Sequence, residues 1–200
     1  MKIYRFIIVS FALVVFTSCK KQAITDEKNT IVEKKSNKDS LLLSTSSKVL
    51  ELLSKKDFES LKAFVTPNSK VLFSPYLYID SKVAQKLSVS ELIDNKVKLN
   101  WGIYDGRGEP INATIDDYFS EFVSNKDFLK SDEITLNSTI VRGSSKNNIL
   151  NVFPNSQQVE YYVKGTDKNQ NKDWNSLILV FEEKNSKYYL IAVVHNEFTT

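Results

Sequence analysis

The sequence predicts an α+β domain in which an N-terminal helix hairpin and a third long helix pack on a curved, mainly antiparallel sheet of about six strands. Three observations predict this class. Apolar residues recur at helical spacing within residues 42–53, 58–65 and 115–123. Stretches rich in β-branched and aromatic residues lie between and after them. No repeat is visible, and residues 41–200 suit one domain of ordinary size.

The helix hairpin is predicted from two short apolar patterns separated by the polar break at residues 54–56. In the first pattern, four apolar residues fall on one face of a helix: Leu42, Val49, Leu50 and Leu53. Asp57 is a good N-cap for the second helix, and Pro67 ends it. The apolar residues of that second helix are Phe58, Leu61, Phe64 and Val65.

The sequence of residues 71–123 predicts two strands and two helices. Residues 71–79 have strand composition but contain Pro75, which favours an edge strand or a bulged one. Ser88 and Glu91 form a capping box for a short helix before Asn95. Residues 97–104 alternate as a half-buried strand does and lead into the turn DGRGEP at 105–110. Thr114 caps the third helix, whose apolar face is Ile115, Tyr118, Phe119, Phe122 and Val123.

Four further strands complete the predicted sheet. They span residues 134–142, 158–164, 174–183 and 187–198. The last two are joined by residues 183–186 and predict a hairpin. The tyrosine pairs at 161–162 and 188–189 are expected to place one ring on each face of the sheet.

The N-terminus has the order of a lipoprotein signal peptide over residues 1–18. Lys2 and Arg5 precede an apolar run at residues 6–16, and two small residues follow before Cys19. The run is too short to span a bilayer, which needs roughly 20 residues. Cys19 is the only cysteine, and its position resembles the acylated cysteine of a lipobox with Phe16 where leucine is usual. We expect cleavage before Cys19 and a membrane anchor of lipid on that thiol.

Residues 19–40 are predicted to be the lipidated cysteine followed by a flexible tether. Lysines, acids and small polar residues dominate them, so they bury too little apolar surface to offset the entropy of ordering. The basic charge of the chain is concentrated before residue 41, because residues 41–200 hold 19 basic and 20 acidic side chains. Nucleic-acid binding relies on clustered cations and is therefore not expected of the domain.

The predicted element order resembles the cone-shaped α+β roll of the NTF2-like (cystatin-like) superfamily. The opening LLSKKDFESLKAFVTP resembles the helix pair of that fold. Five shorter segments resemble a family of uncharacterised bacterial secreted proteins and lipoproteins: FSPYLYID, WGIYDGRGEPI, DYFSEFVSNKDFL, VRG and LVFEEKNSKYYLIAVVH. The first resemblance implies a sheet curled around a cavity mouth that binds small molecules. The second implies a location in the cell envelope and brings no assigned catalytic residues.

No catalytic, metal or cofactor motif is predicted. His195 is the only histidine, so a two-histidine zinc site is excluded. A G-x-S-x-G nucleophile elbow is missing. Gly106 and Gly108 lack the third glycine of a dinucleotide fingerprint, because Ile111 stands in its place.

A candidate pocket is predicted where two strand ends would converge at the cavity mouth. Its residues are Trp101, Tyr104, Asp105, Arg107 and Glu109 at one strand end, with His195 and Glu197 at the other. The alternative is structural. In that case Trp101 lies in the core, residues 105–110 are a turn chosen for its backbone angles, Arg107 pairs with Asp105 or Glu109, and His195 caps a strand.

These expectations lead to a membrane-anchored, extracytoplasmic lipoprotein on the periplasmic or surface side of a bacterial membrane. We expect it to bind an unknown small molecule or envelope protein without catalysis. The alternative is a small-pocket NTF2-like enzyme of the isomerase or hydrolase type, with His195 or a nearby carboxylate transferring a proton. A structural envelope protein is a third alternative, which a contiguous exposed apolar patch would favour.

Overall fold

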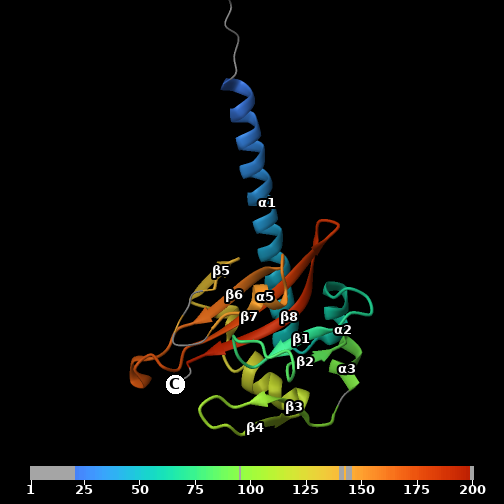
Figure 1. The fold of residues 1–200 in the computed structure, drawn as a ribbon, viewed down its shortest axis with the longest axis vertical. Coiled ribbons are helices and arrows are strands. Elements are labelled where there is room, and N and C mark those ends of the chain that lie inside the picture. The colour runs from blue at the N-terminus through green and yellow to red at the C-terminus, as the bar shows by residue number, and fades with distance from the viewer. Residues whose placement is uncertain (1–20, 95, 140–141, 143–145, 199–200) are drawn as a thin grey trace, which may run out of the picture. The chain divides into compact units, whose positions relative to one another are not determined.

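The computed structural model describes residues 21–94, 96–139, 142 and 146–198, with side chains from residue 35 onward. The predicted signal peptide and Cys19, the predicted site of acylation, lie outside these residues. The chain divides into two units, Met1–Asn37 and the compact Lys38–Thr200. The α+β class predicted from sequence is confirmed, since helices accompany a mainly antiparallel six-stranded sheet (Figure 1).

Helix α1 spans Lys21–Ser54, so the segment expected to be a flexible tether is helical from Lys21 onward. Lysine, glutamine and glutamate are good helix formers, which explains why a polar composition does not prevent a helix here. From residue 42 the predicted apolar face is buried: Leu42, Val49, Leu50 and Leu53. Ser46 on the same side accepts a hydrogen bond of 2.9 Å from the Tyr161 hydroxyl.

The second helix consists of α2 (Phe58–Leu61) and a 3-10 turn (Lys62–Phe64), with the Asp57 side chain accepting from Ser60 N–H as predicted. The capping box is also confirmed. Ser88 N–H donates to the Glu91 carboxylate at 2.7 Å, and Glu91 N–H donates to Ser88 Oγ at 3.2 Å, at the start of α3 (Val89–Asp94). These ends form as expected because capping depends on residues three positions apart.

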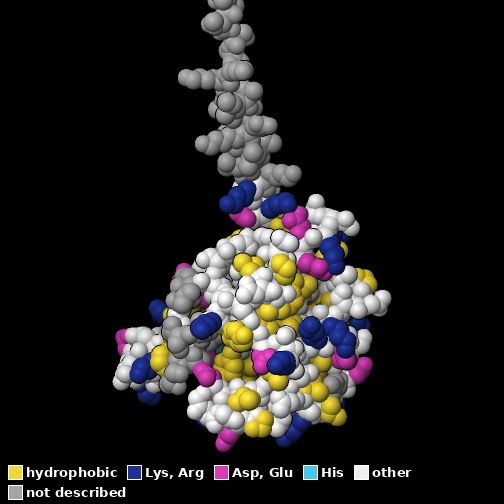
Figure 2. All heavy atoms as spheres, in the orientation of Figure 1, with side chains coloured by type: hydrophobic (Ala, Val, Ile, Leu, Met, Phe, Trp, Pro, Cys, Tyr) yellow, Lys and Arg dark blue, Asp and Glu magenta, His cyan; other side chains and the backbone are white. Residues whose placement is uncertain are grey.

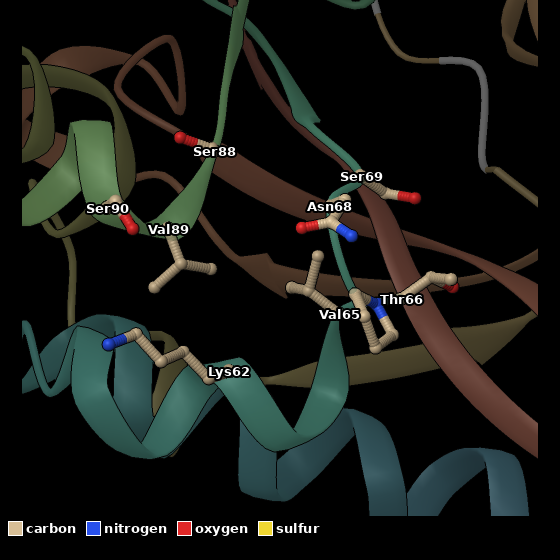
Figure 3. Close-up of a pocket in the computed structure, with 9 residues that line it drawn as sticks. Lys62, Val65, Thr66, Asn68, Ser69, Ser88, Val89 and Ser90 are labelled. Carbon is tan, nitrogen blue, oxygen red and sulfur yellow. The ribbon is translucent and has the colours of Figure 1, made fainter.

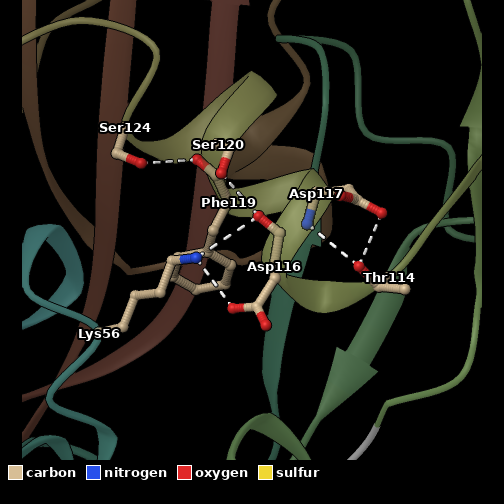
Figure 4. Close-up of polar contacts among 7 residues, drawn as sticks. All are labelled: Lys56, Thr114, Asp116, Asp117, Phe119, Ser120 and Ser124. Atoms are coloured by element: carbon tan, nitrogen blue, oxygen red, sulfur yellow. Dashed lines mark hydrogen bonds and ion pairs between the residues drawn. The ribbon is translucent and has the colours of Figure 1, made fainter.

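The third helix begins at the predicted cap but is short. It consists of α4 (Ile115–Tyr118) and a π-helical turn (Phe119–Val123). Thr114 Oγ accepts from Asp117 N–H, and Lys56 forms an ion pair of 2.9 Å with Asp116 (Figure 4). The Ser124 hydroxyl donates to the carbonyl of Phe119 (Figure 4). The Ser124 N–H donates to the same carbonyl, which ends the helix there. A 3-10 turn follows at Phe128–Lys130.

The six-stranded sheet has the order β2-β1-β8-β7-β6-β5. The strands are β1 (Val71–Ser74), β2 (Gln85–Leu87), β5 (Glu133–Leu136), β6 (Gln157–Val163), β7 (Asn175–Lys184) and β8 (Lys187–Glu197). All pairs are antiparallel except β1 with β8, which is parallel. The β7–β8 hairpin closes through Asn185 and Ser186, both at positive φ, a backbone that matches the twist of the two strands.

The expectation of an edge or bulged strand at residues 71–79 is wrong. Strand β1 ends at Ser74 and lies inside the sheet, between β2 and β8. Pro75 follows the strand and therefore removes no hydrogen bond from its ladder. The predicted strand at 134–142 is likewise shorter, ending at Leu136.

A separate two-stranded sheet is formed by β3 (Leu99–Ile103) and β4 (Pro110–Ala113). The register of this hairpin shifts between Asn100 and Ile103, where Gly102 has a φ of +124° that L side chains rarely adopt. The shift breaks the predicted alternation: Trp101 is buried, whereas Ile103 points to solvent with 60% of its surface exposed.

Apolar side chains cover both faces of the large sheet. The helices cover one face, where Tyr118, Phe119 and Phe122 pack with Phe73 of β1 in an aromatic layer. The other face is covered by the segment after β1 and by α5 (Ile149–Val152), over a smaller cluster on β7 and β8. Figure 2 shows hydrophobic side chains gathered in the middle of the face that carries α5 in Figure 1.

Candidate functional site

Trp101 belongs to the core. Its ring stacks on Tyr118 with centroids 3.8 Å apart and an interplanar angle of 11°, and its Nε1 donates to the Ala113 carbonyl at 2.9 Å. The side chain is fully buried. Trp101 therefore anchors the β3–β4 hairpin to α4, as the structural alternative predicts.

His195 is also enclosed, at 1% exposure, on β8. Its Nδ1 lies 2.9 Å from the carbonyl oxygen of Pro75, which can only accept, so Nδ1 carries the proton. Burial lowers the pKa of His195 to about 4, which keeps the ring neutral near pH 7. Asn175 Oδ1 lies 2.8 Å from Nε2, and Asn125 Nδ2 lies 3.4 Å from it. A neutral Nε2 accepts, so Asn125 Nδ2 is its donor.

The glycine turn brings three predicted residues to one place. The hydroxyl of Tyr104 donates to the Glu121 carboxylate at 2.9 Å. The guanidinium carbon of Arg107 lies 4.1 Å from the centroid of the Tyr104 ring, so Arg107 stacks on Tyr104 rather than pairing with an acid of the turn. Asp105 N–H donates to the hydroxyl of Tyr76 at 3.1 Å.

Glu197, at the end of β8, joins the same place from the sheet. Burial raises the pKa of Glu197, the carboxylates of Glu121 and Asp105 raise it further, and Arg107 lowers it. Burial also raises the pKa of Tyr76, with the negative charges of Glu197, Asp105 and Glu121 adding to the effect. We refer to Tyr76, Tyr104, Asp105, Arg107, Glu121 and Glu197 as the Tyr76 cluster.

The structure thus gathers four of the seven predicted site residues and leaves three apart. Trp101 and His195 are buried structural residues, and Glu109 is exposed and contributes its backbone carbonyl, which accepts from Tyr104 N–H at 2.8 Å. Tyr76 and Glu121 were not predicted. Neither carries a local signal, because each reaches the cluster only through packing against the β3–β4 hairpin.

Beside this cluster lies a small, mainly apolar pocket of about 200 Å³. Tyr76 and Trp101 line it together with Ser74, Pro75, Tyr78, Asp80, Val83, Ala84, Gly102 and Ile103. Three of these residues are large and exposed: Tyr78 at 58%, Val83 at 37% and Ile103 at 60%. Gly102 has no side chain to fill the space, and a Cβ there would already contact the Val83 side chain at 3.6 Å. We call this hollow the Tyr78 pocket.

A larger hollow of about 540 Å³ lies between the end of the second helix and the start of α3. Val65 and Val89 stand on its opposite walls (Figure 3). Three of its polar side chains have partners within the protein: Lys62 with Glu59, Thr66 with Glu182, and Ser88 with Glu91. A third hollow, near Lys56 and Lys96, is also lined by charged side chains.

No family model matches this chain, and no curated protein matches it significantly.

Proposed function

We propose that this chain is a lipid-anchored envelope lipoprotein whose domain binds a partner or ligand without catalysis. The order of Lys2, Arg5, the apolar run and Cys19 supports the anchor. In the part of the chain that the structure describes, no helix is both long and apolar enough to cross a bilayer. Acylation of Cys19 would supply the membrane attachment.

The Tyr78 pocket is the observation that carries the binding proposal. Large apolar side chains exposed singly are normal, whereas a group of them around a concave surface marks a contact site. Tyr78, Val83 and Ile103 form such a group. A volume of about 200 Å³ is smaller than the pockets that hold drug-sized ligands, so the bound group has the size of a single side chain.

Side chains fill the space between the helices and the sheet, where the enzyme alternative would need a cavity. Aromatic rings pack between the helices and the sheet, with Phe73 and Tyr118 6.3 Å apart and Tyr118 and Phe122 5.1 Å apart. His195 lies behind Phe122 at a centroid distance of 5.5 Å and is too enclosed to meet a substrate. Binding at the surface pocket fits this arrangement better than proton transfer by His195.

A titration with 2-phenylethanol tests the binding proposal. The full chain carrying Cys19→Ser is used, because it lacks the acylation site. Saturable changes in the NMR signals of Gly102 and Ile103 are expected, and Val83→Trp should abolish them by filling the pocket. Leu129→Trp is the matched control, since Leu129 is also exposed but does not line the pocket. No saturable change at Gly102 and Ile103, with 2-phenylethanol or with a charged compound of the same size, would exclude the pocket as a binding site.

One observation favours the enzyme alternative. Burial raises the pKa of Glu197, whose charge also acts on the hydroxyl of Tyr76, as expected of a proton-transferring carboxyl. In that case the wild-type chain would turn over a substrate in a panel of isomerase and hydrolase reactions, and Glu197→Gln would reduce the rate by about 100-fold or more. A rate unaffected by Glu197→Gln would remove this alternative.

A further inference from the structure

The Tyr78 pocket differs from the other two described hollows in its lack of a basic side chain. Asp80 lines it, and none of the described residues in its wall is a lysine or an arginine. One of the other hollows is lined by Lys62, and the other by Lys56 and Lys96 together with three acids. Asp80 accepts a hydrogen bond from Lys82 N–H at 3.0 Å and forms no ion pair with a described residue.

The Tyr76 cluster adds negative charge at one wall of the same pocket. Tyr76 belongs to both, and Asp105, Glu121 and Glu197 act on its hydroxyl. Arg107 is the cation that acts on Glu197 there, against two acids. Within the described residues, none of the three carboxylates forms an ion pair.

Aromatic rings line the pocket. Tyr76 and Tyr78 present π systems, whose negative faces attract cations, whereas the ring of Trp101 is fully buried and stacked on Tyr118. The stacking of Arg107 on Tyr104 shows the same preference a few residues away. An apolar hollow with aromatic walls, one lining carboxylate and an excess of acids beside it is complementary to a positive charge on an apolar stem.

We propose that the Tyr78 pocket binds an organic cation: an ammonium carried on an apolar or aromatic group of side-chain size. The inference rests on the proposed binding function and names the chemistry of its ligand. A free amine and the side chain of a partner protein share this chemistry. The ammonium would lie near Asp80 and the Tyr76 hydroxyl, with the stem against Val83 and Ile103.

Three compounds of similar shape and different charge test the proposal. Phenethylamine is a cation at pH 7, 2-phenylethanol is neutral and 3-phenylpropionate is an anion. Each is titrated into the full chain carrying Cys19→Ser while the amide signals of Gly102 and Ile103 are followed. We expect phenethylamine to bind roughly tenfold more tightly than 2-phenylethanol, and 3-phenylpropionate to bind most weakly.

A carboxylate variant separates local charge from total charge. Asp80→Asn keeps the side-chain shape and should reduce the preference for phenethylamine over 2-phenylethanol several-fold. Asp127→Asn removes the same charge from an exposed turn outside the pocket and should leave the preference unchanged. A dipeptide amide that ends in lysine, compared with phenethylamine, distinguishes a protein side chain from a free amine.

The outcomes distinguish the cation proposal from the proposed binding function on which it rests. Equal binding of phenethylamine and 2-phenylethanol would overturn the cation proposal and leave the binding function standing. Tighter binding of 3-phenylpropionate would do the same. No binding of any of the three compounds at Gly102 and Ile103 would overturn both.

Discussion

Nδ1 of His195 donates a hydrogen bond of 2.9 Å to the carbonyl oxygen of Pro75. This contact joins strand β8 to the segment that follows β1 and carries Tyr76 and Tyr78 to the pocket. His195 therefore acts on the site by positioning a backbone segment.

The buried ring makes stability depend on pH. The folded pKa of about 4 lies below the value of 6.5 expected in the unfolded chain. Between these values the unfolded state binds a proton that the folded state does not, so stability is full above pH 6.5 and is lost as pH falls toward 4. We expect protonation of His195 in the unfolded chain to lower the free energy of unfolding by about 2 kcal/mol as the pH falls from 7.5 to 5. Because His195 is the only histidine, its NMR titration is unambiguous, and a midpoint near 6.5 would contradict its enclosure.

Glu197 should act in the opposite direction. Its raised pKa means that the folded state holds the proton more tightly than the unfolded state. Its contribution is therefore most favourable below the unfolded pKa of about 4.3 and is lost as pH rises through the folded value. Glu197→Gln should raise the unfolding temperature at pH 7 and have little effect at pH 4. Glu109→Gln, on the exposed turn, is the control, and equal effects of the two variants would show that Glu197 is not constrained by its neighbours.

Trp101 should behave as a core residue. Trp101→Ala removes a fully buried ring and should cost about 3–5 kcal/mol of unfolding free energy, measured by denaturant titration. Trp101→Phe keeps most of the packing and loses the hydrogen bond to Ala113, so a smaller loss is expected. A cost for Trp101→Ala below about 1 kcal/mol would contradict its place in the core.

Tyr118 offers a complementary prediction. Its hydroxyl is buried and has no hydrogen-bond partner among the residues that the structure describes, while its ring stacks on Trp101. Burial holds the pKa of Tyr118 well above its ordinary value. Tyr118→Phe removes the unpaired group and keeps the stack, so it should leave the unfolding free energy unchanged or raise it. A loss above about 1 kcal/mol would show that the hydroxyl does have a partner in solution.

Local features of this chain were predictable from sequence, and long-range ones were not. The caps at Asp57, Ser88 and Thr114 and the β7–β8 hairpin depend on residues within a few positions of one another. The parallel pairing of β1 with β8 joins residues more than one hundred positions apart, and nothing in either strand specifies it. Strands β2 and β4 were missed because their sequences, QKL and PINA, each hold a single large apolar residue and so show no strand pattern.

The candidate site was predicted only where its residues are close together in the sequence. Tyr104, Asp105 and Arg107 are neighbours in one turn, and a turn keeps its own residues together. The separation of Trp101 from that turn follows from the register shift at Gly102, which periodicity could not reveal. Glu121 reaches Tyr104 from a helix 17 positions away, so only the packing of the hairpin brings them together.

The anchor has its own test. Cys19→Ser removes the thiol that would carry the lipid, so we expect the variant to leave the membrane fraction or to accumulate unprocessed. Immunoblots of separated membrane and soluble fractions measure this. If the variant remained fully in the membrane fraction at its mature size, the lipoprotein assignment would be wrong.

Intermolecular nuclear Overhauser effects measure the occupancy of the pocket most directly. With 2-phenylethanol bound to the full chain carrying Cys19→Ser, we predict contacts from the aromatic protons of the compound to the methyl groups of Val83 and Ile103. Contacts to Val65 and Val89 instead would place the compound in the larger polar hollow and contradict the account.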